Sequence, residues 1–522
     1  MSNVIPIKKF IFSTVGTGLI LSVFILIAMF AIIASQGKVI DTQTGKIKET
    51  GIIRINTSQS LQNVLAYVNN EQKNIKDNRI EFVEVGKVNL KLSRAGFSSW
   101  IKDIELSSNM VKDIYPFFLP ENLDSRINEL LRESDIYPKS VYFLDNLDYF
   151  FILATTKNQR SNDDDSKNSE NFEIWQYFRS DNSRLLNIFI DNNLRLRKVF
   201  EFSDDLSDLI SKNQYELNFS PQGKSFILFF PYSKDFYVGK LNFDGQTNLK
   251  NSEIFSLNNK LSSKVDEIRW LREDRLLVRQ NFNLFDYKIS TDELNVILIS
   301  SDPNYKYVIN DGFTYVIRDK ENALIQYDPS SLRRRKIQMP KNFIFPSEIT
   351  GIYSKYSVKD VFLISSNQGL IYVNLNKDNT FYEILTQEDI FKVIDISKDG
   401  RKFILKEINS SKNQNTYYIY FLENIANNNI QVVVNSIELL SSEEIYFLDN
   451  NMHLIVYNKE NKTLGITDLD GLNKQKLNLD LEILDYFVPT DLRNIYISSY
   501  NKVTVADNAN NNILNLYLIN LD

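Results

Sequence analysis

Cysteine and histidine, two residue types that often carry acid–base, metal or nucleophilic chemistry, are almost missing from this 522-residue sequence. Cysteine is absent, which excludes disulfides, thiolate metal sites and cysteine nucleophiles. There is one histidine, His453, so catalysis by two imidazoles of this chain and zinc binding by three are also excluded. Because His453 lies in an apolar run and has no second histidine or cysteine to work with, we interpret it as a satisfied or half-exposed residue of a β-strand.

Three short charged runs are the other candidate sites. The run from Asp163 to Asp165 carries the oxygen ligands that calcium prefers, but it lacks the alternating spacing of a calcium loop, and we interpret it as a solvated loop. The run from Asp468 to Gly471 predicts a hairpin turn. The run from Arg333 to Lys336 (Arg333, Arg334, Arg335, Lys336) is the one basic cluster. It could contact an anionic polymer or lipid headgroups, although we interpret it as a solvated turn beside a strand.

The sequence contains no motif of a common enzyme class. It lacks the nucleophile elbow, the phosphate-binding loop and the glycine fingerprint of dinucleotide-binding folds. We therefore predict no catalytic, cofactor-binding or metal-binding residue, and no cofactor. Glycosidase chemistry stays open as an alternative, because it needs only two carboxylates and the chain has 66 acidic residues. The net charge of −6 gives no basicity for binding nucleic acid.

The N-terminal region predicts a membrane anchor. The run from Phe10 to Ala34 holds 25 residues without a charge, and as a helix of about 38 Å it would cross a hydrocarbon core of about 30 Å. A buried core helix or a cleavable signal peptide would have a shorter apolar stretch. Lys8 and Lys9 precede the run, which favours a cytoplasmic tail at residues 1–9. We expect a transmembrane signal-anchor helix at residues 10–34 and an extracytoplasmic remainder.

A small all-β module is predicted after the anchor. Residues 35–50 are polar and indicate a linker. From Gly51 onward, apolar and polar residues alternate in short runs that are separated by turn residues such as Asn69-Asn70 and Ser107-Ser108-Asn109. Such alternation is typical of half-buried strands. Five or six of these strands between residues 51 and 120 predict a small β-sandwich.

This module resembles a PEGA domain, a small surface-associated β module. The resemblance rests on residues 51–55, 66–70 and 88–92 and on the corner Arg94-Ala95-Gly96-Phe97-Ser98-Ser99-Trp100. The chain departs from the family at residues 58–63, where the Pro-Glu-Gly-Ala turn would stand, and at Asn70, which replaces a glycine. In the corner, Gly96 can adopt the positive φ of a tight turn. We expect Phe97 and Trp100 to pack in the core.

Residues 121–138 are predicted to be a connector with a short helix. Leu123, Ile127, Leu130 and Leu131 fall on one face of such a helix, and Asp124 could cap it.

The remaining residues, 139–522, repeat with a period of about 45 residues. A strand that ends on a polar turn recurs eight times, at residues 174–181, 237–245, 284–290, 324–328, 370–376, 418–424, 464–471 and 516–522. A polar turn followed by an apolar strand precedes most copies, as at residues 220–228 and 397–405. A helical solenoid would show a period of 3.6, whereas these segments alternate by two. We therefore predict a β-propeller of about seven or eight four-stranded blades.

The turn Ser220-Pro221-Gln222-Gly223-Lys224 and the final strand of this region resemble those of TolB-like and WD-type β-propellers. The likeness implies a fold and no particular role. Residues 157–171 contain no apolar side chain and predict a mobile loop on the first blade. Because nothing follows the strand at residues 516–522, we expect it to be the outermost strand of the last blade. Ring closure would then depend on face-to-face packing against the first blade, through Tyr142 and Leu144.

These features together predict a membrane-anchored binding or scaffold protein of the cell envelope, and not an enzyme. Its partners would be the lipid bilayer, through residues 10–34, and a protein or an envelope glycan at the propeller face, with no role for nucleic acid. The alternative is a propeller-based glycoside hydrolase or lyase that acts on an envelope glycan. A funnel with two facing carboxylates would favour this enzyme.

Overall fold

A computed structural model of the chain describes residues 17–29, 38–40, 46–123, 126–131, 136–144, 149–156, 171–178, 196–243, 253–261, 264–300, 305–318, 321–355, 358–376, 380–385, 391–407, 414–423, 431–477, 479, 481–489, 493–501 and 513–521, without positions 342, 347, 367, 368 and 449. Residues 17–29 form a helix with exposed side chains, and the other residues of the predicted span at 10–34 lie outside the described part. Within the described residues, none of the helices combines the length and the apolar character needed to cross a membrane.

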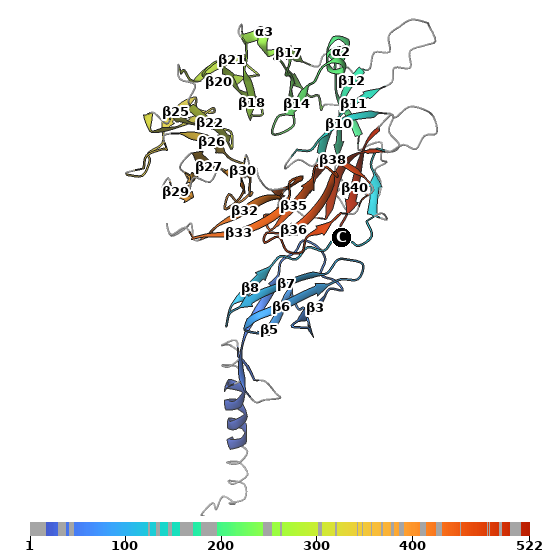
Figure 1. Cartoon of the computed structure of the whole chain (residues 1–522), viewed down its shortest axis with the longest axis vertical. Coiled ribbons are helices and arrows are strands. Elements are labelled where there is room, and N and C mark those ends of the chain that lie inside the picture. The colour runs from blue at the N-terminus through green and yellow to red at the C-terminus, as the bar shows by residue number, and fades with distance from the viewer. Residues whose placement is uncertain are drawn as a thin grey trace, which may run out of the picture.

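The small module consists of two four-stranded sheets in the described part of the chain (Figure 1). One sheet has the order β1-β2-β5, with β8 paired in parallel to β2. The other has the order β4-β3-β6-β7. The strands are β1 (Lys38–Ile40), β2 (Ile47–Ile55), β3 (Leu65–Val68), β4 (Glu71–Lys73), β5 (Arg79–Glu84), β6 (Gly86–Ser93), β7 (Trp100–Leu106) and β8 (Val111–Ile114). The prediction of a small β-sandwich is thus confirmed, although it missed the shorter, more polar strands.

The predicted corner of the module has the expected geometry. Gly96 has a φ of +78°, in the left-handed region that a side chain disfavours. Phe97 and Trp100 are both buried in the module's single apolar core, which they share with alternate residues of β2, β3, β5, β6 and β7. Asn69 and Asn70 also have positive φ, as the tight turn between β3 and β4 requires.

The described strands after the module form eight more four-stranded antiparallel sheets, which are the blades of a propeller. Blade 1 consists of β10 (Tyr137–Tyr142), β11 (Tyr149–Thr156), β12 (Asn171–Phe178) and β13 (Leu196–Glu201), and blade 2 of β14 (Glu216–Phe219), β15 (Ser225–Phe230), β16 (Asp235–Lys240) and β17 (Ile254–Ser256). Blade 3 consists of β18 (Glu267–Arg272), β19 (Arg275–Gln280), β20 (Asn283–Lys288) and β21 (Glu293–Leu298), and blade 4 of β22 (Tyr305–Asn310), β23 (Phe313–Arg318), β24 (Ala323–Asp328) and β25 (Arg333–Lys336). Two short helices, α2 (Asp204–Lys212) and α3 (Leu257–Leu261), follow blades 1 and 2.

Blade 5 consists of β26 (Ile349–Tyr353), β27 (Val361–Ser366), β28 (Gly369–Asn374) and β29 (Thr380–Leu385). Blade 6 consists of β30 (Phe391–Ile396), β31 (Lys402–Glu407), β32 (Gln414–Glu423) and β33 (Gln431–Leu440). Blade 7 consists of β34 (Glu443–Phe447), β35 (His453–Asn458), β36 (Thr463–Asp468) and β37 (Gln475–Lys476). Blade 8 combines β38 (Glu482–Phe487), β39 (Asn494–Asn501) and β40 (Ile513–Asn520) with β9 (Ile127–Glu129). Figure 1 shows the blades arranged in a ring, with the module at its perimeter.

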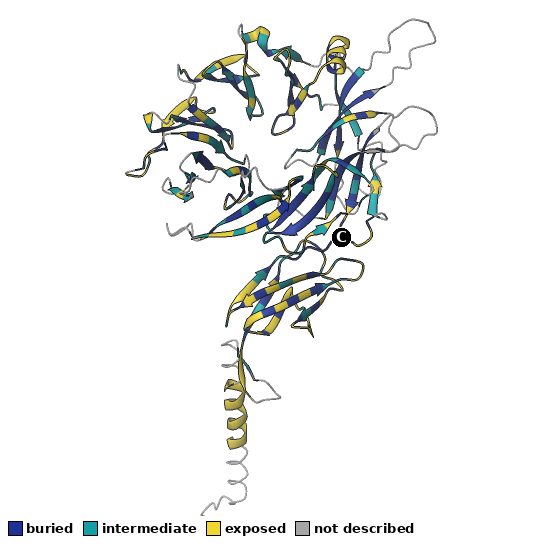
Figure 2. Ribbon diagram, viewed as in Figure 1, coloured by how far each residue is buried: buried dark blue, intermediate teal, exposed yellow. Residues whose placement is uncertain are grey.

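The ring is closed by apolar cores between successive blades. Each strand alternates its side chains between the two faces of its blade, and both faces are apolar because each packs on a neighbouring blade. Among the described residues, every pair of adjacent blades shares one buried cluster, including blades 8 and 1. The ribbon in Figure 2, coloured by burial, has its buried residues mainly along the central strands of the blades and its exposed residues mainly toward the rim. The predicted propeller of seven or eight blades is therefore confirmed, with eight blades in the described structure.

The eight sequence repeats correspond to the third strands of the eight blades, from β12 to β40. The prediction that the last copy is an outermost strand is wrong. β40 pairs with β39 on one side and with β9 on the other, in the register Tyr517↔Glu129, Leu518↔Asn128 and Ile519↔Ile127. Blade 8 is thus completed by residues from before the propeller, which fastens the two ends of the ring in one sheet.

The predicted helix in the connector is also wrong, because β9 occupies residues 127–129. The apolar residues that appeared to share a helical face serve two different cores. Leu123 and Ile127 pack between blades 7 and 8, and Leu130 and Leu131 pack between blades 8 and 1. A strand of three residues is too short to show a period of two, so the spacing of these apolar residues matched a helix by coincidence.

Tyr142 and Leu144 belong to the other face of blade 1, contrary to the prediction. Both pack between blades 1 and 2. Their neighbours Val141 and Phe143 face blade 8 instead, and Phe143 stacks on Phe487 with ring centroids 5.8 Å apart. The alternation was recognised correctly but assigned to the opposite faces, because a blade is apolar on both faces and one residue of offset exchanges them.

Candidate functional site

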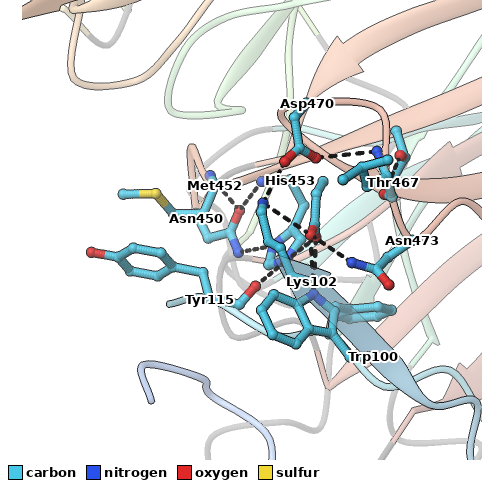
Figure 3. A network of polar contacts seen from close by, with 12 residues as sticks. Trp100, Lys102, Tyr115, Asn450, Met452, His453, Thr467, Asp470 and Asn473 are labelled. Carbon is cyan, nitrogen blue, oxygen red and sulfur yellow. Dashed lines mark hydrogen bonds and ion pairs between the residues drawn. The ribbon is translucent and has the colours of Figure 1, made fainter. Parts of the chain in front are cut away.

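The structure brings two of the sequence candidates together and separates the others. His453, at the start of β35, and Asp468, at the end of β36, lie side by side on blade 7. Figure 3 shows His453 together with Trp100, Lys102 and Tyr115 from the module side. The run Arg333–Lys336 forms β25, an exposed outermost strand, so its interpretation as a turn is wrong. Exposed residues can form a strand because the pairing is made by the backbone. Asp163, Asp164 and Asp165 lie outside the described residues.

The module docks on blade 7 and on the end of blade 8 through a cluster of polar contacts that we call the docking junction. It consists of Gln59, Ser98, Trp100, Lys102 and residues 115–119 from the module side, and of His453, Asp468, Asp470, Asn473, Gln475 and Leu521 from the propeller side. Residues that are more than 300 positions apart in the chain meet here.

Asp468 is the central acceptor of the docking junction. Its side chain is nearly buried, and its Oδ2 accepts hydrogen bonds from Trp100 Nε1 at 3.0 Å and from Asn473 Nδ2 at 3.0 Å. Lys102 Nζ lies 3.4 Å from the same oxygen and 2.6 Å from Asp470 Oδ2. A buried carboxylate is tolerated only when it is paired and hydrogen-bonded, and this one has both kinds of partner. The contact between the module and the propeller therefore depends on particular side chains of both domains.

The turn after β36 shapes this site. Gly471 has a φ of +78°, and a β-carbon at this position would lie 3.2 Å from Ile437 of blade 6. Thr467 Oγ1 donates to the carbonyl of Leu472 at 2.8 Å, and the Gly471 amide donates to the Asp468 carbonyl at 2.9 Å. The predicted hairpin turn at 468–471 is confirmed, and the structure adds that it presents Asp468 and Asp470 to Lys102.

Two glutamines bind the backbone where the chain leaves the module. Gln475 Oε1 accepts from Ser98 Oγ at 2.7 Å and from the Leu119 amide at 3.1 Å, while its Nε2 donates to the Phe117 carbonyl. Gln59 binds both backbone groups of Phe118 at 2.8 Å and donates to the Leu521 carbonyl at 3.2 Å. The bonds of Gln59 are buried and those of Gln475 are partly buried. Each such hydrogen bond contributes about 1 kcal/mol, and together they hold the exit segment in one conformation.

His453 is buried and fully hydrogen-bonded in the junction. Its Nδ1 accepts from Asn450 Nδ2 at 2.8 Å, because an amide nitrogen can only donate, and its Nε2 therefore carries the proton that it donates to the Tyr115 carbonyl at 2.7 Å. This arrangement fits the neutral imidazole. Burial lowers the pKa of His453, and Asp468, whose Oδ1 lies 3.7 Å from Nε2, partly opposes this effect, while the charge of Lys102 adds to it.

We expect acidification to weaken the fold through His453. The folded state holds the imidazole neutral, whereas the unfolded chain takes up a proton as the pH falls through about 6.5. The free energy of unfolding should thus decrease by about 1 kcal/mol between pH 7.5 and 5.5 on account of this residue. Urea unfolding at the two pH values measures it, with His453→Gln as the control, because glutamine can still donate to the Tyr115 carbonyl. Equal pH dependence in the two proteins would contradict the prediction.

Only part of the junction could be recognised in the sequence. The burial of Trp100 was predicted, and a buried indole N–H normally finds an acceptor, but nothing in the sequence pointed to Asp468. Gln59 and Gln475 carry no signal of their own. Among the described residues, no group of three His, Asp or Glu side chains is arranged to hold a metal ion. The chemistry of the site is hydrogen bonding and ion pairing between two domains.

Comparison with known proteins gives structural likeness alone. No family model matches the chain, and no curated protein matches it. The WD40 domain of SCAP from fission yeast is similar with a TM-score of 0.39 and 12% identity, over 76% of this chain and 98% of that one. The β-propeller domain of the Trilobed protease from Pyrococcus furiosus has a TM-score of 0.34 and 12% identity, over 74% and 93%. The dihydro-heme d1 dehydrogenase NirN has a TM-score of 0.38 and 11% identity, over 73% and 75%.

Proposed function

We propose that this chain is a membrane-anchored scaffold protein of the cell envelope, in which a PEGA-like module holds the propeller rigidly outside the membrane so that the propeller can bind a protein or a glycan. The apolar run at residues 10–34, preceded by Lys8 and Lys9, supports the anchor and its direction. The module follows it directly in the chain.

The docking junction is the observation that carries this proposal. A binding domain on a flexible tether would need no specific contact with its spacer. Here the spacer and the propeller share the buried Trp100–Asp468 hydrogen bond, and two glutamines fix the segment between them. The helix at 17–29 and the propeller lie at opposite ends of the module (Figure 1). A spacer built in this way presents the propeller in a defined orientation, which is useful for a scaffold.

Topology is tested by adding a protease to intact cells. We expect the protease to remove the propeller, while a tag placed before Lys9 stays protected, because the positive flank keeps this tail inside. Cells permeabilised before digestion serve as the control, in which the tag is also lost. Protection of residues 50–522 in intact cells would contradict the proposed orientation.

A glycoside hydrolase or lyase is the second candidate, and Asp485 is the observation that favours it. Asp485 lies on β38 and is exposed to solvent, but nearby protein atoms displace enough water to raise the pKa of its carboxyl, which is a property of a general acid. Burial also raises the pKa of Tyr486, and the charges of Asp485 and Asp395 add to the effect, so both carboxylates lie within electrostatic reach of one side chain. Asp395, however, already binds Lys355 and the Phe447 amide. Hydrolysis of an envelope glycan by the purified protein would overturn the scaffold proposal.

A further inference from the structure

The outermost strand of blade 4 is a continuous row of cations. All four residues of β25 are exposed, and we call Arg333, Arg334, Arg335 and Lys336 the basic edge. β25 pairs with β24 on one side, in the register Asp328↔Arg333 to Ile325↔Lys336. Within the described residues no strand pairs with its other side. The basic edge therefore faces solvent along its whole length (Figure 2).

The charge of the basic edge is not neutralised within the described part of the chain, where no carboxylate forms an ion pair with any of its four residues. Asp328 is the one acidic residue opposite them in the register, and its carboxylate already accepts hydrogen bonds from the Ser330 amide and the Ser331 hydroxyl. Lys198 on β13, the outermost strand of blade 1, provides a contrast. It pairs with Glu173 at 2.9 Å and with Glu201 at 3.1 Å.

The spacing of the basic edge suits a chain of anions. Successive side chains of a strand point to opposite faces, so Arg333 and Arg335 lie on one side of the edge and Arg334 and Lys336 on the other. Residues on the same side are about 6.7 Å apart. An extended polymer that follows the edge can thus meet cations on both of its sides. The planar guanidinium groups favour phosphate, which they bind with two parallel hydrogen bonds.

We propose that the basic edge binds a phosphate-rich anionic polymer. An acidic protein strand that extends the sheet is a poorer fit, because strand pairing would use the backbone groups of β25, whereas the guanidinium groups are best matched by phosphate. Lipid headgroups of the anchoring membrane are also a poorer fit. β25 lies on the side of the ring away from the module (Figure 1). With the proposed anchor in the membrane, on which this comparison rests, the module separates β25 from the lipid headgroups.

Binding of fluorescent polyphosphate to the full-length protein in detergent tests the proposal by anisotropy. We expect saturable binding that weakens when the salt concentration is raised, because exposed charges are screened. The variant with all four residues of the basic edge changed to serine should bind about tenfold more weakly or worse. The control changes Lys212, Lys234, Lys264 and Lys306 to serine. It removes the same charge from dispersed positions and should bind within about twofold of the unchanged protein.

Three results would overturn the proposal: no binding by the unchanged protein, an equal loss in both serine variants, or tighter binding of polyglutamate than of polyphosphate. A fourth contrary result is that the basic-edge variant self-associates yet binds polyphosphate normally. The cations would then serve to keep strand edges from pairing. Changing the three arginines to lysine keeps the charge and should weaken polyphosphate binding only partly. This variant also separates charge from folding, because it is expected to melt as the unchanged protein does.

Discussion

Deleting residues 513–522 should abolish the cooperative folding of the propeller. β40 lies between β39 and β9, so its removal takes a central strand out of blade 8 and leaves β9 without its partner. The same strand and Leu521 contribute side chains to the cores between blades 7 and 8 and between blades 8 and 1. A fully buried leucine or isoleucine contributes about 1.5–3 kcal/mol, and the loss of several is comparable with the about 5–15 kcal/mol that stabilises a typical domain.

Near-UV circular dichroism and calorimetry measure this effect, and two point variants calibrate it. Leu516→Ala should lower the free energy of unfolding by about 2–5 kcal/mol, because Leu516 is completely buried. Asn128→Ser, at the exposed position of the neighbouring strand β9, should change it by about 0.5 kcal/mol or less. If the truncated protein keeps its melting transition and only aggregates, β40 is an outer strand after all and the closure by β9 is refuted.

Breaking the hydrogen bond between Trp100 and Asp468 should separate the module from the propeller. Trp100→Phe keeps an aromatic ring in the module core but removes the Nε1 donor. Asp468→Asn keeps an oxygen that can accept but removes its charge, which weakens the bond. We expect a coupling energy of about 1–3 kcal/mol between the two changes, because the hydrogen bond between the two side chains is buried and has a charged acceptor. The melting curve of either variant should split into two transitions as the domains lose their contact.

The ion pair between Lys87 and Asp103 provides the matched control within the same module. Its atoms are 3.2 Å apart, and both side chains are largely exposed. A double-mutant cycle at this pair should give less than about 1 kcal/mol and leave a single transition. A coupling at Trp100 and Asp468 as small as this control would show that the junction is held by other contacts.

The sequence by itself determined the class and the order of the parts. Alternation by two within short runs is a local property, so it identified the small β module and the repeated strands of the propeller without any knowledge of the tertiary structure. Residues with a local conformational requirement were also recognisable, such as Gly96 in its tight turn and Asn69-Asn70 between β3 and β4. The absence of cysteine and the presence of a single histidine limited the possible chemistry before any fold was known.

The tertiary structure alone decided which elements meet. The closure of the ring depends on β9, three residues whose pattern resembled a helix and whose partner Leu518 lies near the other end of the chain. The docking junction joins Trp100 to Asp468 across 368 positions, and Gln59 to Leu521 across 462. The faces of blade 1 were exchanged in the prediction because each face is apolar. These pairings join residues that are far apart in the chain. The alternation of apolar and polar residues within one strand does not specify which distant strand or surface it will contact.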